Sequence, residues 1–415
     1  MPLFEHQQKI INEDPKITGL FLGTGSGKTL TALCLARGKT LVICPKTQKE
    51  DRNWERENEQ NNLKVKLTVI SKEYFRDHWG ELEQYDTIIN DEAHTCLGVT
   101  PETRQVNKKP VKKTSQLFGN LQLYMKKYPP IRLYLCTATI MRSPMTVWGA
   151  ATILGYDWNW YEFRDTFYFK IPSPGYREIW IARSDDATKD RLARAVRTIG
   201  YVGRLEDFFD VPPQTYKTIY LELTSAQKKK IKELKIEYPE PIVRVGKIHQ
   251  LENGVLTGDE FSKGESYENA KIDTIHDLAI EFPRMVIFAK YRAQIDAIAS
   301  SLSEKKYKVL TLTGDTKERG EVIKEANKSK ECIFIAQAQI SAGWELPEYP
   351  VMIFASRTYS FVDYDQSIGR IQRANNIKKN LYITLVTRGG VDEAVDKCLA
   401  NKKDFSDRIY TNELE

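Results

Sequence analysis

Long apolar runs are missing from this 415-residue sequence, and their absence bears first on the class of protein. A membrane-spanning helix needs roughly 18 consecutive apolar residues, and no segment offers them. Residues 1–16 also lack a basic flank followed by an apolar stretch, so they do not have the pattern of a secretory signal. We therefore expect a protein without a membrane partner that works in the cytoplasm.

Cysteine and histidine are also scarce, with six and five residues respectively. The cysteines are widely spaced, no C-x-x-C pair occurs, and no cluster of cysteine and histidine is present. Most of the cysteines lie inside apolar runs such as residues 40–45 and 132–138. A zinc site and a disulfide framework are both disfavoured, and we interpret the cysteines as buried free thiols.

The composition is that of a soluble globular protein, with 41% hydrophobic and 28% charged residues. The length suits two well-buried domains of roughly 150 to 200 residues better than one. A net charge of +6 permits a polyanionic partner, although this charge alone favours one only mildly.

Short apolar runs alternate with amphipathic stretches in both halves of the chain. This alternation is typical of an α/β fold in which helices cover both faces of a parallel sheet. The first series of predicted strands comprises residues 17–22, 40–45, 67–71, 86–91 and 132–139. The second comprises residues 284–290, 308–314, 331–337, 351–356 and 381–387.

A Pro-Pro pair, Pro212 and Pro213, separates the two series and cannot continue a helix. We therefore predict a first domain over residues 1–207, a linker over 208–217 and a second domain over 218–415. The second domain opens with a strand at 217–223 and a Lys-rich helix at 224–235. Residues 237–270 are polar and contain glycine, and we interpret them as an insertion or arm outside the sheet.

A glycine-rich loop follows the first predicted strand and opens a helix at Lys28 and Thr29. Glycines suit such a loop because backbone N–H groups must curl around phosphate oxygens, which a Cβ would obstruct. Lys28 would reach the β- and γ-phosphates of ATP, and the Thr29 hydroxyl would bind Mg²⁺. The residues predicted to cradle the phosphates are Gly23, Thr24, Gly25, Ser26 and Gly27.

A second apolar run ends in Asp91-Glu92-Ala93-His94. A strand that delivers two adjacent carboxylates to the carboxyl edge of a sheet can use one for a metal ion and the other for a water molecule. We assign Asp91 to Mg²⁺ and Glu92 to the general base of hydrolysis. By itself this tetrapeptide could be a solvated acidic turn, but its place behind a phosphate loop favours the catalytic interpretation.

These elements together resemble a superfamily 2 helicase with a DEAH box, and the resemblance extends over most of the chain. It implies two tandem RecA-like domains with the ATP site in the cleft between them. Leu3 to Gln7 resemble the upstream glutamine motif, which implies that Gln7 recognises adenine. Thr137 and Thr139 resemble motif III, which couples hydrolysis to movement. Residues 343–347 resemble motif V, with Glu345 where aspartate is more usual, and imply an ATP contact there.

Residues 366–373 match Q-x-x-G-R-x-x-R, the pattern of motif VI. A phosphate loop and two carboxylates leave the developing charge on the γ-phosphate uncompensated on one side. We predict that Arg370 and Arg373, three residues apart on one helical face, close that side as arginine fingers. The resemblance adds Gln366 to this catalytic group.

Several further segments resemble the SWI/SNF-type branch and its small bacteriophage-encoded relatives. They are residues 44–46, Trp54, Glu57, residues 137–154, 202–214 and 223–227. The sequence departs from the branch at Ala138, where glycine is usual, and at Ile140, where proline is usual. The branch implies a DNA-stimulated ATPase that moves along duplex DNA or remodels branched DNA, in a bacterial or phage-infected cell.

The expected cofactors are ATP and Mg²⁺, and the expected partner is duplex or branched DNA. A monomer is favoured, with possible protein partners in replication or recombination. An RNA helicase is the first alternative, because DEAH boxes occur there too. A non-hydrolysing ATP-dependent loader or clamp is a second alternative, although it would leave the full motif set without a purpose.

Nucleic-acid contacts are predicted from charge and from the resemblance. Residues 104–132 contain eight Lys or Arg and no Asp or Glu, a pattern that suits a phosphate backbone or a solvated surface about equally. Motifs Ia and Ib supply Lys46, Thr47, Ser71 and Lys72 as backbone contacts. Nine aromatic residues lie in 158–180, and we favour a packing patch over base stacking for them.

Overall fold

The computed structural model describes residues 3–98, 103–106, 109–112, 115–171, 179–258, 264–340, 344–372 and 378–400. The chain forms two compact units, Met1–Asp210 and Val211–Glu415. The division falls inside the segment 208–217 in which the Pro-Pro pair lies. None of the helices in these described ranges is long and apolar enough to span a membrane.

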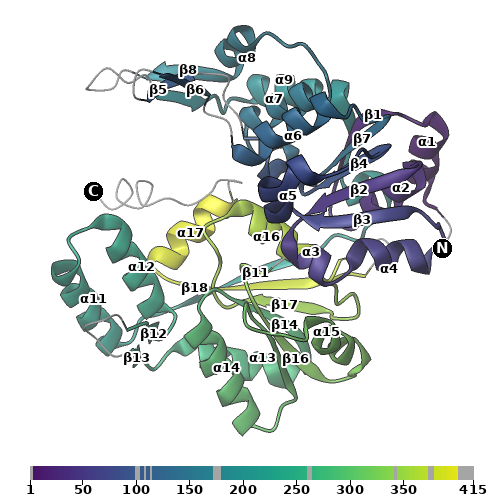
Figure 1. The fold of residues 1–415 in the computed structure, drawn as a ribbon. Helices are drawn as coiled ribbons and strands as arrows, with labels where there is room; N and C mark the ends of the chain where they lie inside the picture. The colour runs from purple at the N-terminus through teal and green to yellow at the C-terminus, as the bar shows by residue number, and fades with distance from the viewer. Residues whose placement is uncertain are drawn as a thin grey trace. The chain divides into compact units, whose positions relative to one another are not determined.

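A six-stranded sheet forms the centre of the first unit, with the order β10-β1-β7-β4-β2-β3 (Figure 1). Every pairing in it is parallel. The predicted strands of the first series are all present, and the edge strand β10 is one that the apolar pattern did not reveal. The strands are β1 (Ile17–Leu22), β2 (Lys39–Cys44), β3 (Lys66–Ser71), β4 (Thr87–Asp91), β7 (Arg132–Cys136) and β10 (Gly200–Gly203).

Helices cover both faces of this sheet. Successive residues of a strand point to opposite sides, so strands that are apolar throughout have apolar side chains to bury on both faces. In β2, Leu41 and Ile43 belong to one buried apolar cluster, and Val42 and Cys44 belong to another. The helices are α1 (Glu5–Glu13), α2 (Lys28–Leu35), α3 (Lys46–Glu50), α4 (Asn53–Gln60), α5 (Lys72–His78), α6 (Gln116–Lys127), α7 (Pro144–Ile153), α8 (Trp160–Phe167), α9 (Asp186–Ile199) and α10 (Leu205–Phe208).

The second unit repeats this architecture with the strand order β11-β18-β17-β14-β16-β15 (Figure 1). All of its pairings are parallel, and the predicted second series of strands is confirmed. Alternate residues of β14 again enter different clusters, Ile287 on one face and Phe288 on the other. The strands are β11 (Thr215–Leu221), β14 (Arg284–Ala289), β15 (Val309–Leu312), β16 (Cys332–Gln337), β17 (Val351–Phe354) and β18 (Leu381–Thr387).

Seven helices complete the described part of the second unit. Two of them, α11 and α12, pack with α17 around a separate apolar cluster that includes Leu234, Val245 and Val395. The helices are α11 (Ser225–Glu237), α12 (Pro241–Glu252), α13 (Ala270–Glu281), α14 (Arg292–Glu304), α15 (Arg319–Lys328), α16 (Phe361–Ile368) and α17 (Val391–Ala400). The predicted arm over 237–270 therefore contains a helix, α12, followed by the short strand pair β12 (Val255–Leu256) and β13 (Glu265–Ser266).

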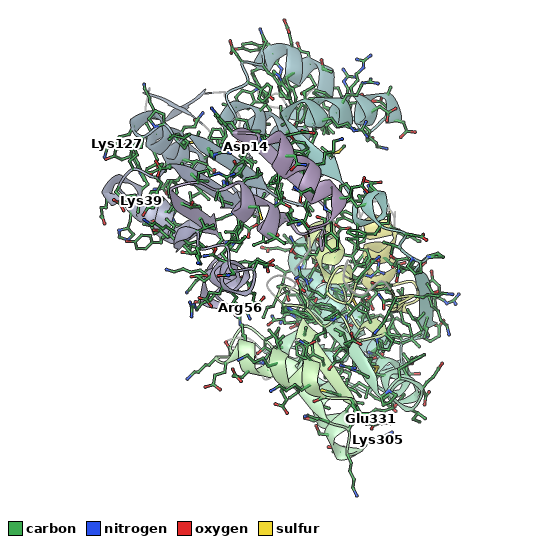
Figure 2. All side chains as sticks on the ribbon, turned by 90° about the vertical axis from the view of Figure 1, so that its right-hand side faces the viewer. Asp14, Lys39, Arg56, Lys127, Lys305 and Glu331 are labelled. Atoms are coloured by element: carbon green, nitrogen blue, oxygen red, sulfur yellow. The ribbon has the colours of Figure 1, made fainter. Side chains whose placement is uncertain are left out.

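Charged side chains project from the surface of both units, as Lys39 and Lys127 do in the first and Lys305 and Glu331 in the second (Figure 2). The aromatic segment after residue 157 instead packs inward for the most part. Phe163 and Phe167 of α8 are buried in the main cluster of the first unit, and Trp160 packs against it. The packing interpretation is therefore confirmed for these side chains, whereas Tyr161 is 65% exposed.

Short antiparallel pairs and single turns complete the described structure. The pairs are β5 (Thr103–Val106) with β6 (Lys109–Lys112) and β8 (Tyr168–Ile171) with β9 (Ile179–Ala182). The 3₁₀ turns are η1 (Trp79–Glu81), η2 (Ala93–Thr95) and η3 (Ile140–Arg142).

Candidate active site

Three polar segments of the first unit reach the same edge of the sheet. Because its strands are parallel, the loops after β1, β7 and β4 all begin at their carboxyl ends. These strands are neighbours in that order, and the register places Leu20 beside Cys136 and Cys136 beside Asp91. Strand spacing puts the first and third segments roughly 10 Å apart, a distance that a nucleotide triphosphate and its metal ion can bridge.

The loop after β1 has the backbone that the glycine pattern predicted. Gly25 and Gly27 both have φ of +81°, a conformation that side chains with a Cβ rarely adopt. A Cβ on Gly27 would also lie 2.4 Å from Gln7 Nε2. The Ser26 hydroxyl donates to Gly23 O at 2.6 Å and holds the loop closed on itself. The glycines thus permit a tight turn whose N–H groups lead into helix α2.

Lys28 is the first residue of α2, and its ammonium turns back into the loop. Nζ donates to Leu22 O at 2.7 Å and to Gly23 O at 2.9 Å. Its charge is therefore held inside the curve of the loop, where phosphate oxygens would replace carbonyl oxygens as acceptors. Thr29 is half-buried in the same first helical turn.

Gln7 forms hydrogen bonds with this loop and with the helix that follows it. It is fully buried, and Nε2 donates to Gly27 O at 3.0 Å and to Thr31 Oγ1 at 3.2 Å. Its Oε1 accepts a hydrogen bond from Phe4 N at 2.9 Å. In this arrangement Gln7 links α1 to the phosphate loop, and its recognition of adenine stays a prediction.

His6 is a neighbour of the loop that sequence reasoning did not identify. Its Nε2 lies 2.9 Å from Ser26 O, and its ring stacks on Phe208 with centroids 4.0 Å apart. Burial lowers the pKa of His6, against the opposing effect of the Ser26 backbone carbonyl. His6 and Phe208, which are distant in sequence, therefore stack on each other beside the loop.

Asp91 is the last residue of β4, and two donors orient its carboxylate. Oδ1 accepts from Glu92 N at 2.9 Å, and Oδ2 accepts from Trp54 Nε1 at 3.3 Å. Burial raises the pKa of Asp91 to about 6, with the neighbouring Glu92 charge acting in the same direction and Lys72 and Lys28 opposing it. Trp54, which is 1% exposed, was noticed only as part of the family pattern, and its role here is to fix this carboxylate.

The Glu92 carboxylate lies beside His94, and one of its oxygens has no hydrogen-bond partner. Its Oε2 lies 3.4 Å from His94 Nδ1, but that nitrogen is hydrogen bonded to Thr137 Oγ1 at 2.8 Å. Oε2 therefore has no hydrogen bond of its own although it is buried. Burial would raise the pKa of Glu92, but His94 with Lys28 and Lys72 outweighs it, so the pKa lies below its ordinary value. An ionised, unsatisfied oxygen is what a base for a water molecule requires.

Thr137 and Thr139 lie at the same edge, directly after β7. Thr137 is fully buried, and its hydroxyl oxygen accepts from Thr139 N at 3.1 Å as well as contacting His94. Thr139 Oγ1 is buried without a hydrogen-bond partner. The segment resembling motif III thus contacts the turn at residues 91–94 directly, through His94.

The predicted nucleic-acid residues of the first unit divide into two groups. Lys46 is exposed at the start of α3, 3.7 Å from Glu50, and Thr47 beside it is half-buried. Ser71 instead caps α5 by accepting from Tyr74 N at 3.1 Å. Lys72 is 7% exposed and donates inward to Glu92 O at 2.6 Å, which corrects its placement as a surface contact. The basic segment places exposed Lys126 and Lys127 in the last turn of α6, but residues 107–108 and 113–114 lie outside the described ranges.

The second unit holds the residues that resemble motifs V and VI. Helix α16 ends at Ile368, so Arg370 lies in the turn that follows, and the prediction of a helical face shared with Arg373 is wrong for Arg370. Arg370 is 7% exposed, and its guanidinium donates to Gln366 O at 3.0 Å and Trp344 O at 2.9 Å. Gln366 is buried and Glu345 is exposed. Gly343 and Arg373 lie outside the described residues.

The side chains of the first unit suit Mg²⁺ bound together with a nucleotide. In the described part of the chain no group of three or more His, Cys, Asp or Glu side chains could hold a metal ion alone. Mg²⁺ is commonly bound by one or two protein oxygens and by the phosphates of its substrate, and Thr29 and Asp91 offer such oxygens. The Asp91 carboxylate has further lone pairs beyond its two hydrogen bonds.

Known proteins resemble the chain in part or in fold. The family described as helicase conserved C-terminal domain matches residues 270–375. The chain is 25% identical over 192 residues to the chromatin-remodeling ATPase INO80 of Mycosarcoma maydis, a match that covers 44% of this chain and 10% of that protein. The chain thus spans about a tenth of the length of this curated relative.

Two solved structures are similar to most of the chain. The helicase domain of Pyrococcus furiosus Hef is 14% identical, with a TM-score of 0.50, 96% of this chain covered and 98% of that chain. The Sulfolobus solfataricus SWI2/SNF2 ATPase core in complex with dsDNA is 17% identical, with a TM-score of 0.39, 97% of this chain covered and 91% of that chain. None of these three relatives is a bacteriophage protein. Residues 270–375 are therefore similar to the helicase conserved C-terminal domain, and the two parallel sheets have the tandem RecA-like fold of the Hef helicase domain.

Proposed function

We propose that the protein is an ATP-hydrolysing DNA helicase or translocase of superfamily 2 and of the SWI/SNF type. The observation that carries the proposal is the joint placement of a phosphate loop and a paired carboxylate at one sheet edge. Lys28 is turned into the loop, and Glu92 presents a buried oxygen without a hydrogen bond. This combination suits the transfer of a phosphoryl group to water.

In the proposed reaction each residue of the first unit has a separate task. The loop N–H groups and Lys28 would bind the phosphates, and Thr29 and Asp91 would hold Mg²⁺, which when bound would supply positive charge against the phosphates. Glu92 accepts a proton from the attacking water through Oε2, which lies 3.4 Å from His94 Nδ1. Thr137 transmits the state of this turn to the segment after β7 through His94.

The second unit supplies the remaining charge in this proposal. Arg373 acts as the arginine finger, whereas Arg370 orders the segment around it by binding the carbonyls of Gln366 and Trp344. ATP would then be hydrolysed only when both units engage it, and Gln7 and Glu345 would contact the nucleotide. Duplex or branched DNA would bind through Lys46, Thr47 and the basic segment, since exposed lysines suit a phosphate backbone. The proposed setting is a bacterial or phage-infected cell.

The test is a panel of ATP hydrolysis assays with single-stranded, duplex and forked DNA beside RNA. Stimulation by duplex or forked DNA, and not by RNA, is the expected result. Stimulation by RNA alone would make the protein an RNA helicase. Tight ATP binding without turnover on any nucleic acid would identify a loader or clamp. Glu92→Gln, purified in the same way, controls for contaminating ATPases.

A further inference from the structure

Lys72 occupies an unusual place for a residue expected on the nucleic-acid surface. It is the first residue of α5, directly after β3, and it is only 7% exposed. Its ammonium donates to Glu92 O at 2.6 Å and to Thr95 Oγ1 at 2.5 Å. Among the described residues it has no ion-pair partner, and its two acceptors are these oxygens of the turn at residues 91–95. A buried ammonium is costly unless it is well hydrogen bonded, which makes this pairing a specific one.

The carbonyl oxygen to which Lys72 donates belongs to Glu92, a residue with a strained backbone conformation. Glu92 has φ of +45° and ψ of +47°, the left-handed region, which is disfavoured for residues with a Cβ. Three donors converge on its carbonyl oxygen, because Thr95 Oγ1 and Thr95 N also donate to it, at 3.0 and 3.1 Å. Of these donors only Lys72 comes from outside the turn. It therefore ties the strained residue to the end of β3, which β2 separates from β4 in the sheet.

The direction of the Glu92 side chain depends on this backbone. The left-handed turn directly after β4 is what puts the carboxylate 3.4 Å from His94 and leaves Oε2 without a hydrogen bond. A return of φ to negative values would swing the Cα–Cβ bond and move the carboxylate away from both His94 and the phosphate loop. Displacements of about 1 Å in such groups reduce turnover by roughly a hundredfold.

We propose that Lys72 is a positioning residue for the general base, which fixes the left-handed turn at Glu92 by binding its carbonyl oxygen. The proposal deepens the proposed function and rests on Glu92 being the base. It replaces the expectation that Lys72 contacts nucleic acid, which would require the ammonium at the surface.

The test is Lys72→Met, which keeps the length of the side chain and removes its donors. With saturating ATP and DNA, turnover should fall by about 10- to 100-fold. The DNA concentration that gives half-maximal stimulation and the affinity for ATP should stay unchanged, because neither ligand touches Lys72 in this account. Lys66→Met is the matched control, since Lys66 is an exposed lysine at the other end of the same strand and should have no effect.

Two further variants, Thr95→Ala and the double variant of Lys72→Met with Glu92→Gln, control for misfolding and test whether Lys72 acts through Glu92. Thr95 is exposed, so Thr95→Ala removes one donor to Glu92 O and one acceptor of Lys72 without opening the core. It should lower turnover in the same direction, again at unchanged DNA half-saturation. Single-turnover rates of Lys72→Met, Glu92→Gln and the double variant form a cycle, in which the double variant should be no slower than Glu92→Gln.

Either of two results would overturn the proposal. A raised DNA half-saturation with full turnover at saturation would make Lys72 a nucleic-acid contact. Losses that multiply in the double variant would mean that Lys72 acts independently of Glu92. If no nucleic acid stimulates the wild type, the proposed function fails, and the unstimulated turnover of Lys72→Met against wild type still tests the positioning role.

Discussion

At the scale of single residues, most polar atoms around the phosphate loop serve to shape it. Lys28 differs from Gln7, Ser26 and Gly27 because it brings a full positive charge into the curve. Its present acceptors, Leu22 O and Gly23 O, are neutral carbonyls that a phosphate would outcompete.

Lys28→Ala should lower ATP turnover to below roughly one tenth of the wild-type rate, because no other side chain of the loop supplies a charge for the transition state. The measurement is phosphate release under saturating duplex DNA. Lys189→Ala, an exposed lysine of α9, serves as the control. Turnover retained above one tenth would show that the loop does not bind the reacting phosphate.

Glu92→Gln should behave differently from Lys28→Ala. The amide keeps the size of the side chain and leaves Asp91 and Thr29 free to bind the metal ion, but it cannot accept the proton. Turnover should fall by about 10²- to 10⁴-fold while the affinity for ATP is kept. Equilibrium binding of a fluorescent ATP analogue, measured beside single-turnover hydrolysis, separates the two effects. Loss of nucleotide affinity would contradict the role of Glu92 as base.

Residue types were easier to predict from the sequence than side-chain directions. The glycines at 25 and 27 and the carboxylates at 91 and 92 follow from what phosphate and metal chemistry require. Lys72 and Arg370 are long cations that the family pattern places on ligands, yet both bind carbonyl oxygens inside their own unit. Trp54 contacts Asp91 across 37 positions of sequence, a distance that no local pattern reveals.

At the scale of secondary-structure elements, buried parallel strands were predictable because they are short, continuous apolar runs. The edge strand β10 was not, since Gly200 and Gly203 give it little apolar character. Helix α12 was missed because polar residues with buried roles break its apolar pattern. His249 and Glu252 face inward beside Val245 and Ile248. Their partners are distant in sequence, so the segment has the composition of a surface arm.

Buried polar contacts fasten α12 to the rest of the second unit. Glu252 accepts from Val391 N at 2.8 Å and Asp392 N at 3.0 Å, at the start of α17. His249 Nε2 lies 2.9 Å from Asp392 Oδ1, and its Nδ1 lies 2.9 Å from the Tyr291 hydroxyl. Lys271 also binds Asp392, at 2.6 Å. These buried contacts attach α12 to the start of α17.

His249 makes the attachment of α12 sensitive to acid. Burial lowers the pKa of His249 to about 4, against the opposing effect of Asp392. Between pH 6.5 and 4 the unfolded state binds a proton that the folded state does not, so stability is lost as the pH falls through this range. Relative to His249→Gln, the wild type should lose about 2 kcal/mol between pH 7 and pH 5.

The measurement is hydrogen exchange of the α12 amides in both proteins at the two pH values, corrected for intrinsic exchange. Burial raises the pKa of Glu252 to about 8, which gives the opposite dependence on pH, but this carboxyl is present in both proteins and cancels in the comparison. A difference between wild type and variant that does not change with pH would show that His249 does not titrate in this range.

At the scale of the whole molecule, the residues that we propose as catalytic are divided between two units of similar architecture. Lys28, Asp91 and Glu92 belong to Met1–Asp210, and Arg373 belongs to Val211–Glu415. We therefore expect neither unit alone to be a complete ATPase. If nucleic acid favours the state in which both units engage ATP, it must tighten ATP binding by the factor by which ATP tightens nucleic-acid binding.

In our proposal the two units share one hydrolytic site, and Arg373→Ala tests this sharing. We expect ATP binding to be kept, since the phosphate loop is intact, and DNA-stimulated turnover to fall by roughly a thousandfold. The decisive measurement is stimulated ATP turnover of Arg373→Ala beside the wild type and a chain ending at Asp210. Stimulated turnover should be lost in both altered proteins. Hydrolysis by either protein at close to the wild-type stimulated rate would show that the hydrolytic site is not shared.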